Sequence, residues 1–150
     1  MSLKVGILSD THGLLRPEVV SVLSACDYIL HAGDLDTPEI FQALRSIAPL
    51  YAVRGNNDLE WAEGLPASLS FEIGGVGFFM AHQRRDVPDA PGGADIVLCG
   101  HSHRYSEERS GGRLWLNPGS CGKRRFRLEL TMATLQIDQG AYRLTKLAFP

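Results

Sequence analysis

Five short apolar runs constrain the fold more than any other feature of this sequence. They occupy residues 5–8, 28–30, 51–53, 78–81 and 96–99. All but the fourth are nearly continuous rather than alternating, which is typical of central strands covered on both faces. None approaches the roughly 20 apolar residues that a membrane-spanning helix needs. We therefore predict a sheet whose two faces are both buried.

Helix-start signals separate the first three runs. Pro17 and Pro38 each stand at a first helical position, and Thr37 is a candidate N-cap. From residue 70 onward the pattern becomes mostly β, with a hairpin at Gly74-Gly75, a surface loop at 83–93, and later strands at 114–116, 127–135 and 142–147. A chain of 150 residues buries about two thirds of its surface, so we predict one domain over 1–150.

The charge balance and the cysteine pattern exclude several classes of protein. A net charge of -2 gives no global field that would attract DNA or an anionic membrane. Three cysteines without CxxC spacing argue against a disulfide framework or a thiolate zinc site. Residues 1–4 lack the features of a signal peptide, so we expect a cytoplasmic location and no membrane partner.

Every one of the five apolar runs is followed by side chains that can ligate a metal. In chain order these are Asp10 and His12, Asp34, Asn56 and Asp58, His82, and His101 and His103. Ligands of open α/β sheets bind beyond the carboxyl ends of the strands, so these side chains can converge on one crevice. Each motif alone is weak, since Asp-x-His arises by chance about 0.3 times in a chain of this composition.

The donor chemistry favours transition metals. Carboxylates, imidazoles and an amide oxygen without thiolate suit Mn²⁺, Fe, Co²⁺, Ni²⁺ or Zn²⁺ rather than Ca²⁺ or Mg²⁺. With Asp58 taken as a supporting residue, two carboxylates, four imidazoles and one amide oxygen remain. These seven candidate ligands are too many for one ion, so we predict two divalent cations, with manganese the first expectation. Taken singly, Asp10 could cap a turn, His82 could be a satisfied histidine, and Asn56-Asn57 could form a tight turn. His31 is expected to be buried and hydrogen-bonded, not a ligand.

At these positions the chain resembles the calcineurin-like metallophosphoesterases. The matching motifs, spread over about residues 3–121, are Asp10-Thr11-His12, Gly33-Asp34, Gly55-Asn56-Asn57-Asp58, His82, Gly100-His101-Ser102-His103 and Asn117-Pro118-Gly119-Ser120. The resemblance is strongest to the small bacterial and archaeal phosphodiesterase branch. It implies an α/β fold, a four-layer α-β-β-α sandwich with two mixed β-sheets.

The same resemblance implies the roles of the site residues. One metal would be held by Asp10, His12, Asp34 and His103, and the other by Asp34, Asn56, His82 and His101. Asp34 would bridge the two ions, and a bridging hydroxide would attack phosphorus. Asp58 and Asn117 would support the site. The implied catalytic set is Asp34, His12, Asn56 and Asn57.

This sequence departs from the family pattern near the site. Asn57 stands where many members carry a histidine that protonates the leaving oxygen, and Gln83 stands where glycine is usual. The interval 83–94 is short for the helix that relatives place there, which predicts a more open mouth. Arg84, Arg85 and Arg124 are candidate ligands for substrate phosphate, or simply a solvated basic face.

The leading function is therefore a phosphodiesterase acting on a small or nucleotide-like diester. A phosphomonoesterase is the alternative on the same metal site, and a non-catalytic scaffold resembling the retromer subunit of this fold is a second. Nucleic acid is expected only as a substrate, and the oligomeric state is left open.

Overall fold

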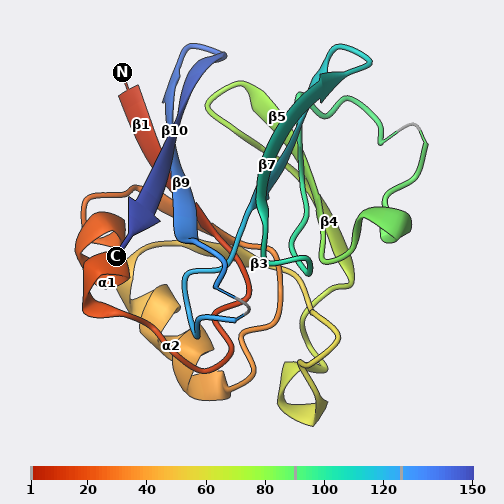
Figure 1. The fold of residues 1–150 in the computed structure, drawn as a ribbon. Coiled ribbons are helices and arrows are strands. Elements are labelled where there is room, and N and C mark those ends of the chain that lie inside the picture. The colour runs from red at the N-terminus through yellow and green to blue at the C-terminus, as the bar shows by residue number, and fades with distance from the viewer. Residues whose placement is uncertain (1, 90, 126) are drawn as a thin grey trace.

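Two mixed five-stranded sheets pack against each other in the computed structural model, which describes residues 2–89, 91–125 and 127–150 (Figure 1). The first sheet has the order β10-β9-β1-β2-β3 and contains β1 (Ser2–Leu8), β2 (Tyr28–His31), β3 (Leu50–Ala52), β9 (Leu130–Asp138) and β10 (Ala141–Phe149). The second has the order β4-β5-β6-β8-β7 and contains β4 (Ser68–Ile73), β5 (Val76–Ala81), β6 (Ile96–Leu98), β7 (Tyr105–Ser110) and β8 (Arg113–Pro118). The predicted pair of mixed sheets is confirmed.

Each sheet combines a parallel part with antiparallel strands. β1, β2 and β3 pair in parallel, as do β5, β6 and β8. β9 and β10 in the first sheet, and β4 and β7 in the second, run antiparallel to their neighbours. The carboxyl ends of the parallel strands therefore form one edge in each sheet, where ligands of such folds bind.

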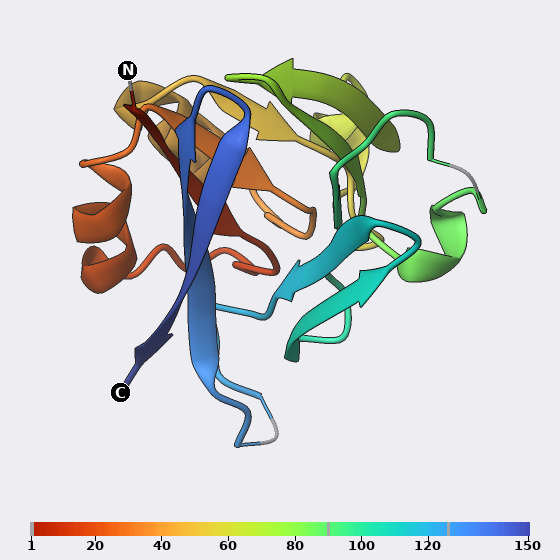
Figure 2. The ribbon, with the colours of Figure 1, turned by 90° about the horizontal axis from the view of Figure 1, so that it is seen from above.

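Two helices cover the outer face of the first sheet. α1 (Pro17–Leu23) and α2 (Pro38–Ile47) both begin at the prolines that the sequence pattern singled out. The Thr37 side chain accepts a hydrogen bond from the Ile40 amide at 3.4 Å, as expected of an N-cap. α1 lies at the far side of the first sheet from the second sheet (Figure 2).

Apolar side chains bury both faces of the central strands. Val5 and Ile7 of β1 pack between the two sheets, whereas Leu8 packs under the helices with Leu23 and Leu44. β1 and β2 are thus covered on both sides, which explains why their apolar runs do not alternate.

The outer face of the second sheet has a different cover. Instead of an α-helix, the segment after β5 forms one short 3₁₀ turn, η2 (Arg84–Asp86), beside an apolar cluster that contains Val97, Cys99 and Trp115. A second 3₁₀ turn, η1 (Glu60–Ala62), follows β3. The expected absence of a helical wall at 83–94 holds for the described residues of that segment, which omit Ala90.

Three details differ from the sequence prediction. β7 was not expected, because its side chains are polar and mostly exposed and its pairing is set by β8. β4 starts at Ser68, earlier than predicted, and β9 starts only at Leu130, since Arg127 adopts a left-handed backbone with φ 60°. Among the described residues, no helix has the length and apolar character to cross a membrane.

Candidate metal centre

Backbone hydrogen bonds join the loops that follow the parallel strands. The Asp10 amide donates to the Gly33 carbonyl at 2.9 Å, and the His12 amide donates to the Asp34 carbonyl at 3.0 Å. In the second sheet the Gly100 amide donates to the His82 carbonyl at 2.9 Å. The strand ends therefore meet in one crevice, as the sequence predicted.

Two clusters of donor atoms face each other in this crevice. Asp10, His12 and His103 form the first, and Asp34, His82 and His101 form the second; within each, the potential ligand atoms lie within 4.8 Å of one another. Asn56 joins the second cluster, because its Oδ1 lies 3.1 Å from His101 Nδ1. The structure thus brings together all seven side chains that the sequence singled out as metal ligands.

The spacing in the first cluster suits donors arranged around a cation. His103 Nε2 lies 3.5 Å from Asp10 Oδ1, and His12 Nε2 lies 3.7 Å from the same oxygen. The two Nε2 atoms are 3.1 Å apart. Donors that each bind one ion at about 2.0–2.2 Å stand at separations of this size.

Asp34 lies between the two clusters. Its Oδ2 is 3.1 Å from His82 Nε2 in the second cluster and 3.8 Å from His12 Nε2 in the first. Its other oxygen accepts a hydrogen bond from the Asn57 amide at 2.8 Å, which fixes the carboxylate plane. This is the position that a carboxylate shared by two ions requires.

Two buried polar atoms of the two donor clusters lack hydrogen-bond partners among the described residues. They are Asp10 Oδ1 and His82 Nε2. Leaving a buried polar atom unsatisfied costs about 1–3 kcal/mol, so such atoms call for an explanation. Both belong to the donor clusters, and a bound cation would satisfy both. The residues present therefore fit a metal centre.

The hydrogen bonds of the histidine rings also favour a metal centre. His82 Nδ1 lies 2.7 Å from the Ala32 carbonyl, which can only accept, so Nδ1 keeps its hydrogen, and loss of a proton from Nε2 leaves a lone pair there that can bind a cation. His12 Nδ1 lies 3.0 Å from Asp36 Oδ2 and is held in the same manner. Asp36 was missed by the sequence analysis, although its spacing from Asp34, one residue between two carboxylates, was a usable signal.

Backbone strain is concentrated in these loops. Six residues of the centre adopt left-handed backbone: Asp10, His12, Asp34, Asp36, His101 and His103, with φ between 47° and 75°. Non-glycine residues rarely adopt this conformation, and such strain clusters at functional sites. Gly100 permits the close approach of two loops, because a Cβ there would lie 2.6 Å from Asp10 Oδ2.

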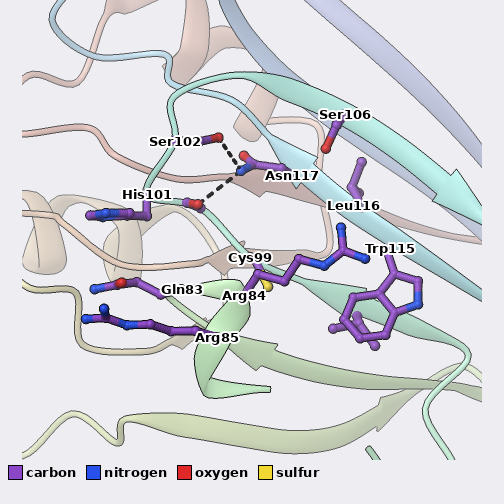
Figure 3. A pocket seen from close by; sticks show the side chains of 12 residues that line it. Gln83, Arg84, Arg85, Cys99, His101, Ser102, Ser106, Trp115, Leu116 and Asn117 are labelled. Atoms are coloured by element: carbon purple, nitrogen blue, oxygen red, sulfur yellow. Dashed lines mark hydrogen bonds between the residues drawn. The ribbon is translucent and has the colours of Figure 1, made fainter. Parts of the chain in front are cut away.

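Asp58 and Asn117 hold the loops that carry the ligands. The Asp58 carboxylate accepts from the backbone amides of Asp34 and Gly55, each at 2.9 Å, and of Asp36 at 2.8 Å. The side-chain Nδ2 of Asn117 donates to the Gly100 carbonyl and to Ser102 Oγ, each at 3.0 Å (Figure 3).

His31 is buried and hydrogen-bonded, as predicted. The Gly33 amide donates to His31 Nδ1 at 3.0 Å, so the Nε2 hydrogen is directed to Thr11 Oγ1, also at 3.0 Å. Burial lowers the pKa of His31 to about 3, which keeps the ring neutral. His31 thereby links the loop after β1, which carries Thr11, to the loop after β2, which carries Gly33.

The charges of the centre reinforce one another. Burial alone would raise the pKa of Asp34, but the neighbouring His82 and the Asn57 amide outweigh it, so the pKa lies below its usual value. The pKa of Asp10 is lowered for a similar reason: His12, His82 and other neighbours outweigh its burial. Both carboxylates are therefore ionised and available as ligands at neutral pH.

The remaining predicted residues differ in what they contact. Arg84 covers the ring of Trp115, Arg85 lines a cavity beside His101, and Arg124 Nη1 donates to the Leu128 carbonyl at 3.1 Å. Asn57 is exposed, and its side-chain oxygen lies 3.4 Å from Asn56 Nδ2. The structure thus brings Arg85 near the centre and holds Arg84 and Arg124 in contacts of their own.

Comparisons with known proteins give matches over most of the chain. The family model for the calcineurin-like phosphoesterase superfamily domain matches residues 3–140. A probable metallophosphoesterase from Methanothermobacter thermautotrophicus is 33% identical over 130 residues, covering 77% of this chain and 76% of that protein.

Two solved structures extend the comparison. One, described as a novel archaeal phosphodiesterase, is 25% identical with a TM-score of 0.78 and covers 97% of this chain and 100% of that one. Vps29 from Chaetomium thermophilum, 19% identical, has a TM-score of 0.79 and covers 98% of this chain and 97% of that one. The likeness to Vps29 concerns the fold alone.

Proposed function

Because this chain belongs to the calcineurin-like phosphoesterase superfamily, we propose that it hydrolyses phosphodiesters with the help of two divalent metal ions. The observation that carries the proposal is the Asp34 carboxylate, which lies within 4 Å of a histidine from each donor cluster. The unsatisfied Asp10 Oδ1 and His82 Nε2 atoms support it.

The ligand assignment follows the two clusters. Asp10, His12, Asp34 and His103 would hold one ion, and Asp34, Asn56, His82 and His101 would hold the other. When bound, the two ions would supply an acidified water as nucleophile and positive charge for the phosphoryl oxygens. The mixed oxygen and nitrogen donors favour Mn²⁺, with Fe, Zn²⁺, Co²⁺ or Ni²⁺ as alternatives.

The protein's own groups favour substrates with good leaving groups. Asn57 is exposed at the rim beside Asn56, and an amide cannot deliver a proton at useful acidity. The leaving oxygen must therefore depart without a side-chain acid at this position. We expect aryl esters, whose leaving oxygens have low pKa values, to react faster than alkyl esters.

Two observations favour a diester over a monoester. Arg84 turns away from His101 and lies over the Trp115 ring, so its guanidinium is not placed to meet a second phosphate charge at the candidate metal centre (Figure 3). The relative described as an archaeal phosphodiesterase adds support. A non-catalytic scaffold is the weaker alternative, since it has no need of strained loops that bring seven donor groups together.

The test compares bis(4-nitrophenyl) phosphate with 4-nitrophenyl phosphate, each with EDTA and with Mn²⁺. We expect Mn²⁺-dependent turnover with the diester preferred, and a loss of at least 100-fold in Asp34→Asn. Asp89→Asn, an exposed aspartate on the 83–94 segment, is the matched control and should keep full activity.

Either of two results would contradict the proposal. Preference for the monoester would make the protein a phosphomonoesterase on the same metal site. No turnover with any added divalent metal would favour the scaffold.

A further inference from the structure

A cavity of about 320 Å³ lies on the outer face of the second sheet, next to the candidate metal centre. His101, a member of the second donor cluster, lines one part of it, and Val97, Cys99 and Trp115 line the part that lies on β6 and β8. Figure 3 shows this cavity with Gln83, Arg84 and Arg85 on its other side. Its volume lies within the usual range for small-molecule sites, about 300–1,000 Å³.

The far part of the cavity is built for a flat ring. Trp115 is half-buried, and the Arg84 guanidinium lies 4.7 Å from the centre of its indole. Arg84 is held there by Glu108, but the two side chains are 59% and 55% exposed, so the pair contributes little and can open. A planar group can therefore enter against the indole and be covered by the guanidinium, gaining stacking and cation–π contacts on its two faces.

The near part of the cavity meets the metal centre. Gln83 and Arg85 point in the same direction as His101, whereas Arg84 turns the other way, toward Trp115 (Figure 3). A phosphoryl group held at His101 would thus have the cavity beside it. The guanidinium of Arg85 adds positive charge at that end, as an anionic ester requires.

We propose that this cavity recognises a planar aromatic or heteroaromatic ring carried by one ester arm of the substrate. The inference rests on the proposed function, because it assigns the ring to a phosphodiester. An aryl group and a nucleobase share the required chemistry. An alkyl arm would fill the same space without stacking on Trp115.

The first test measures ring binding without catalysis. The chain has two tryptophans, so Trp61→Phe leaves Trp115 as the only indole N–H signal in an ¹H–¹⁵N spectrum. In EDTA, phenyl phosphate and adenosine 5′-monophosphate should shift this signal saturably, whereas methyl phosphate and ribose 5-phosphate should not. Arg84→Ala should weaken the binding of the ring-bearing probes about threefold. Arg109 is an exposed arginine near Tyr142, and Arg109→Ala should leave this binding unchanged.

The second test distinguishes the two sources of the ring. Trp115→Leu keeps an apolar side chain and should lower kcat/KM about tenfold for ring-bearing diesters. If Trp115→Leu lowers kcat/KM for thymidine 5′-(4-nitrophenyl phosphate) but not for methyl 4-nitrophenyl phosphate, the cavity is assigned to the nucleobase. Equal losses with both would assign it to the aryl arm. Arg84→Ala, at an exposed position, repeats the comparison if Trp115→Leu folds poorly.

The tests separate the failure of this inference from that of the proposed function. If probes with and without a ring act alike on Trp115 while Mn²⁺-dependent hydrolysis persists, the ring site is wrong and the phosphodiesterase stands. If rings bind but no metal-dependent hydrolysis occurs, the assignment to an ester arm is overturned together with the proposed function.

Discussion

His12 and His82 are each held at Nδ1, which directs Nε2 into the metal centre. Their histidine identity and their place after strands were predictable from the sequence. Their fixed tautomers were not, because the partner of His82 is the backbone carbonyl of Ala32, which no side-chain motif reveals. The spacing of Asp36 from Asp34 was a signal in the sequence, but the contact of Asp36 with His12 depends on the loop that turns it toward that ring. These contacts hold the two rings in the orientation that a metal ligand requires.

Removing the Asp36 side chain should weaken metal binding. Asp36→Ala frees the His12 ring, and the loss of such a partner typically costs 10–100-fold in metal affinity or activity. Titration calorimetry with Mn²⁺ measures it, and Asp36→Asn, which retains an acceptor oxygen, should recover most of the affinity. Equal affinities for the wild type and Asp36→Ala would show that Asp36 does not position His12.

His31 should make the metal-free protein sensitive to acid. Its pKa is about 3 when folded and about 6.5 when unfolded, so below pH 6.5 the unfolded chain binds a proton that the folded chain does not. The free energy of unfolding therefore falls as the pH drops through 6.5, by about 2 kcal/mol at pH 5.

The measurement is urea unfolding in EDTA at pH 7.5 and pH 5 for the wild type and His31→Gln. The variant should be less stable at pH 7.5 but should lose about 2 kcal/mol less on acidification. The acid sensitivity of Asp10 and Asp34 is present in both proteins and cancels. If the free energy of unfolding fell by the same amount in both proteins between pH 7.5 and pH 5, His31 would not be the cause of the acid sensitivity.

At the scale of elements, the centre is made by loops that follow strands. The apolar runs and prolines identified β1, β2, α1 and α2, because burial and helix-start chemistry are local properties of the sequence. β7 escaped prediction because its polar residues have no apolar period and are ordered only by pairing with β8. The left-handed backbone of the loops after the strands also escaped prediction, because it depends on contacts between these loops.

Gly100 is the contact point at which two such loops meet. A Cβ there would collide with Ser9 Oγ and Asp10 Oδ2, which hold the loop after β1. Gly100→Ala should therefore lower the free energy of unfolding by about 1–3 kcal/mol and weaken Mn²⁺ binding. The control is Gly64→Ala, since a Cβ at Gly64 meets nothing within 4 Å. Equal thermal stability of the two variants would contradict this packing account.

In the molecule as a whole, the candidate metal centre lies where the two sheets meet. Asp10, His12 and Asp34 follow strands of the first sheet, while His82, His101 and His103 follow strands of the second. The fold could be predicted from the motifs that resemble the family, and the convergence of the candidate ligands from their places after the strands. The ring-binding cavity could not, since it depends on how η2 brings Arg84 over Trp115.

Bound metal should therefore stabilise the assembly of the two sheets. A ligand at 100 times its Kd stabilises the folded state by about 2.7 kcal/mol, which corresponds to a rise of about 5–10 °C in Tm for a chain of this size. Differential scanning calorimetry with Mn²⁺ and with EDTA measures the rise. Asp34→Asn should show a clearly smaller rise, and an identical rise would place the bound metal outside the two clusters.

We propose that two ions act together at the Asp34 carboxylate, which lies between the two donor clusters. The most direct measurement titrates Mn²⁺ into the metal-stripped protein and follows bis(4-nitrophenyl) phosphate hydrolysis against bound metal. If both ions are required, we expect little activity at one equivalent of Mn²⁺ and full activity only as the second ion binds. Full activity at one equivalent, or no activity at two equivalents of any divalent transition metal, would contradict it.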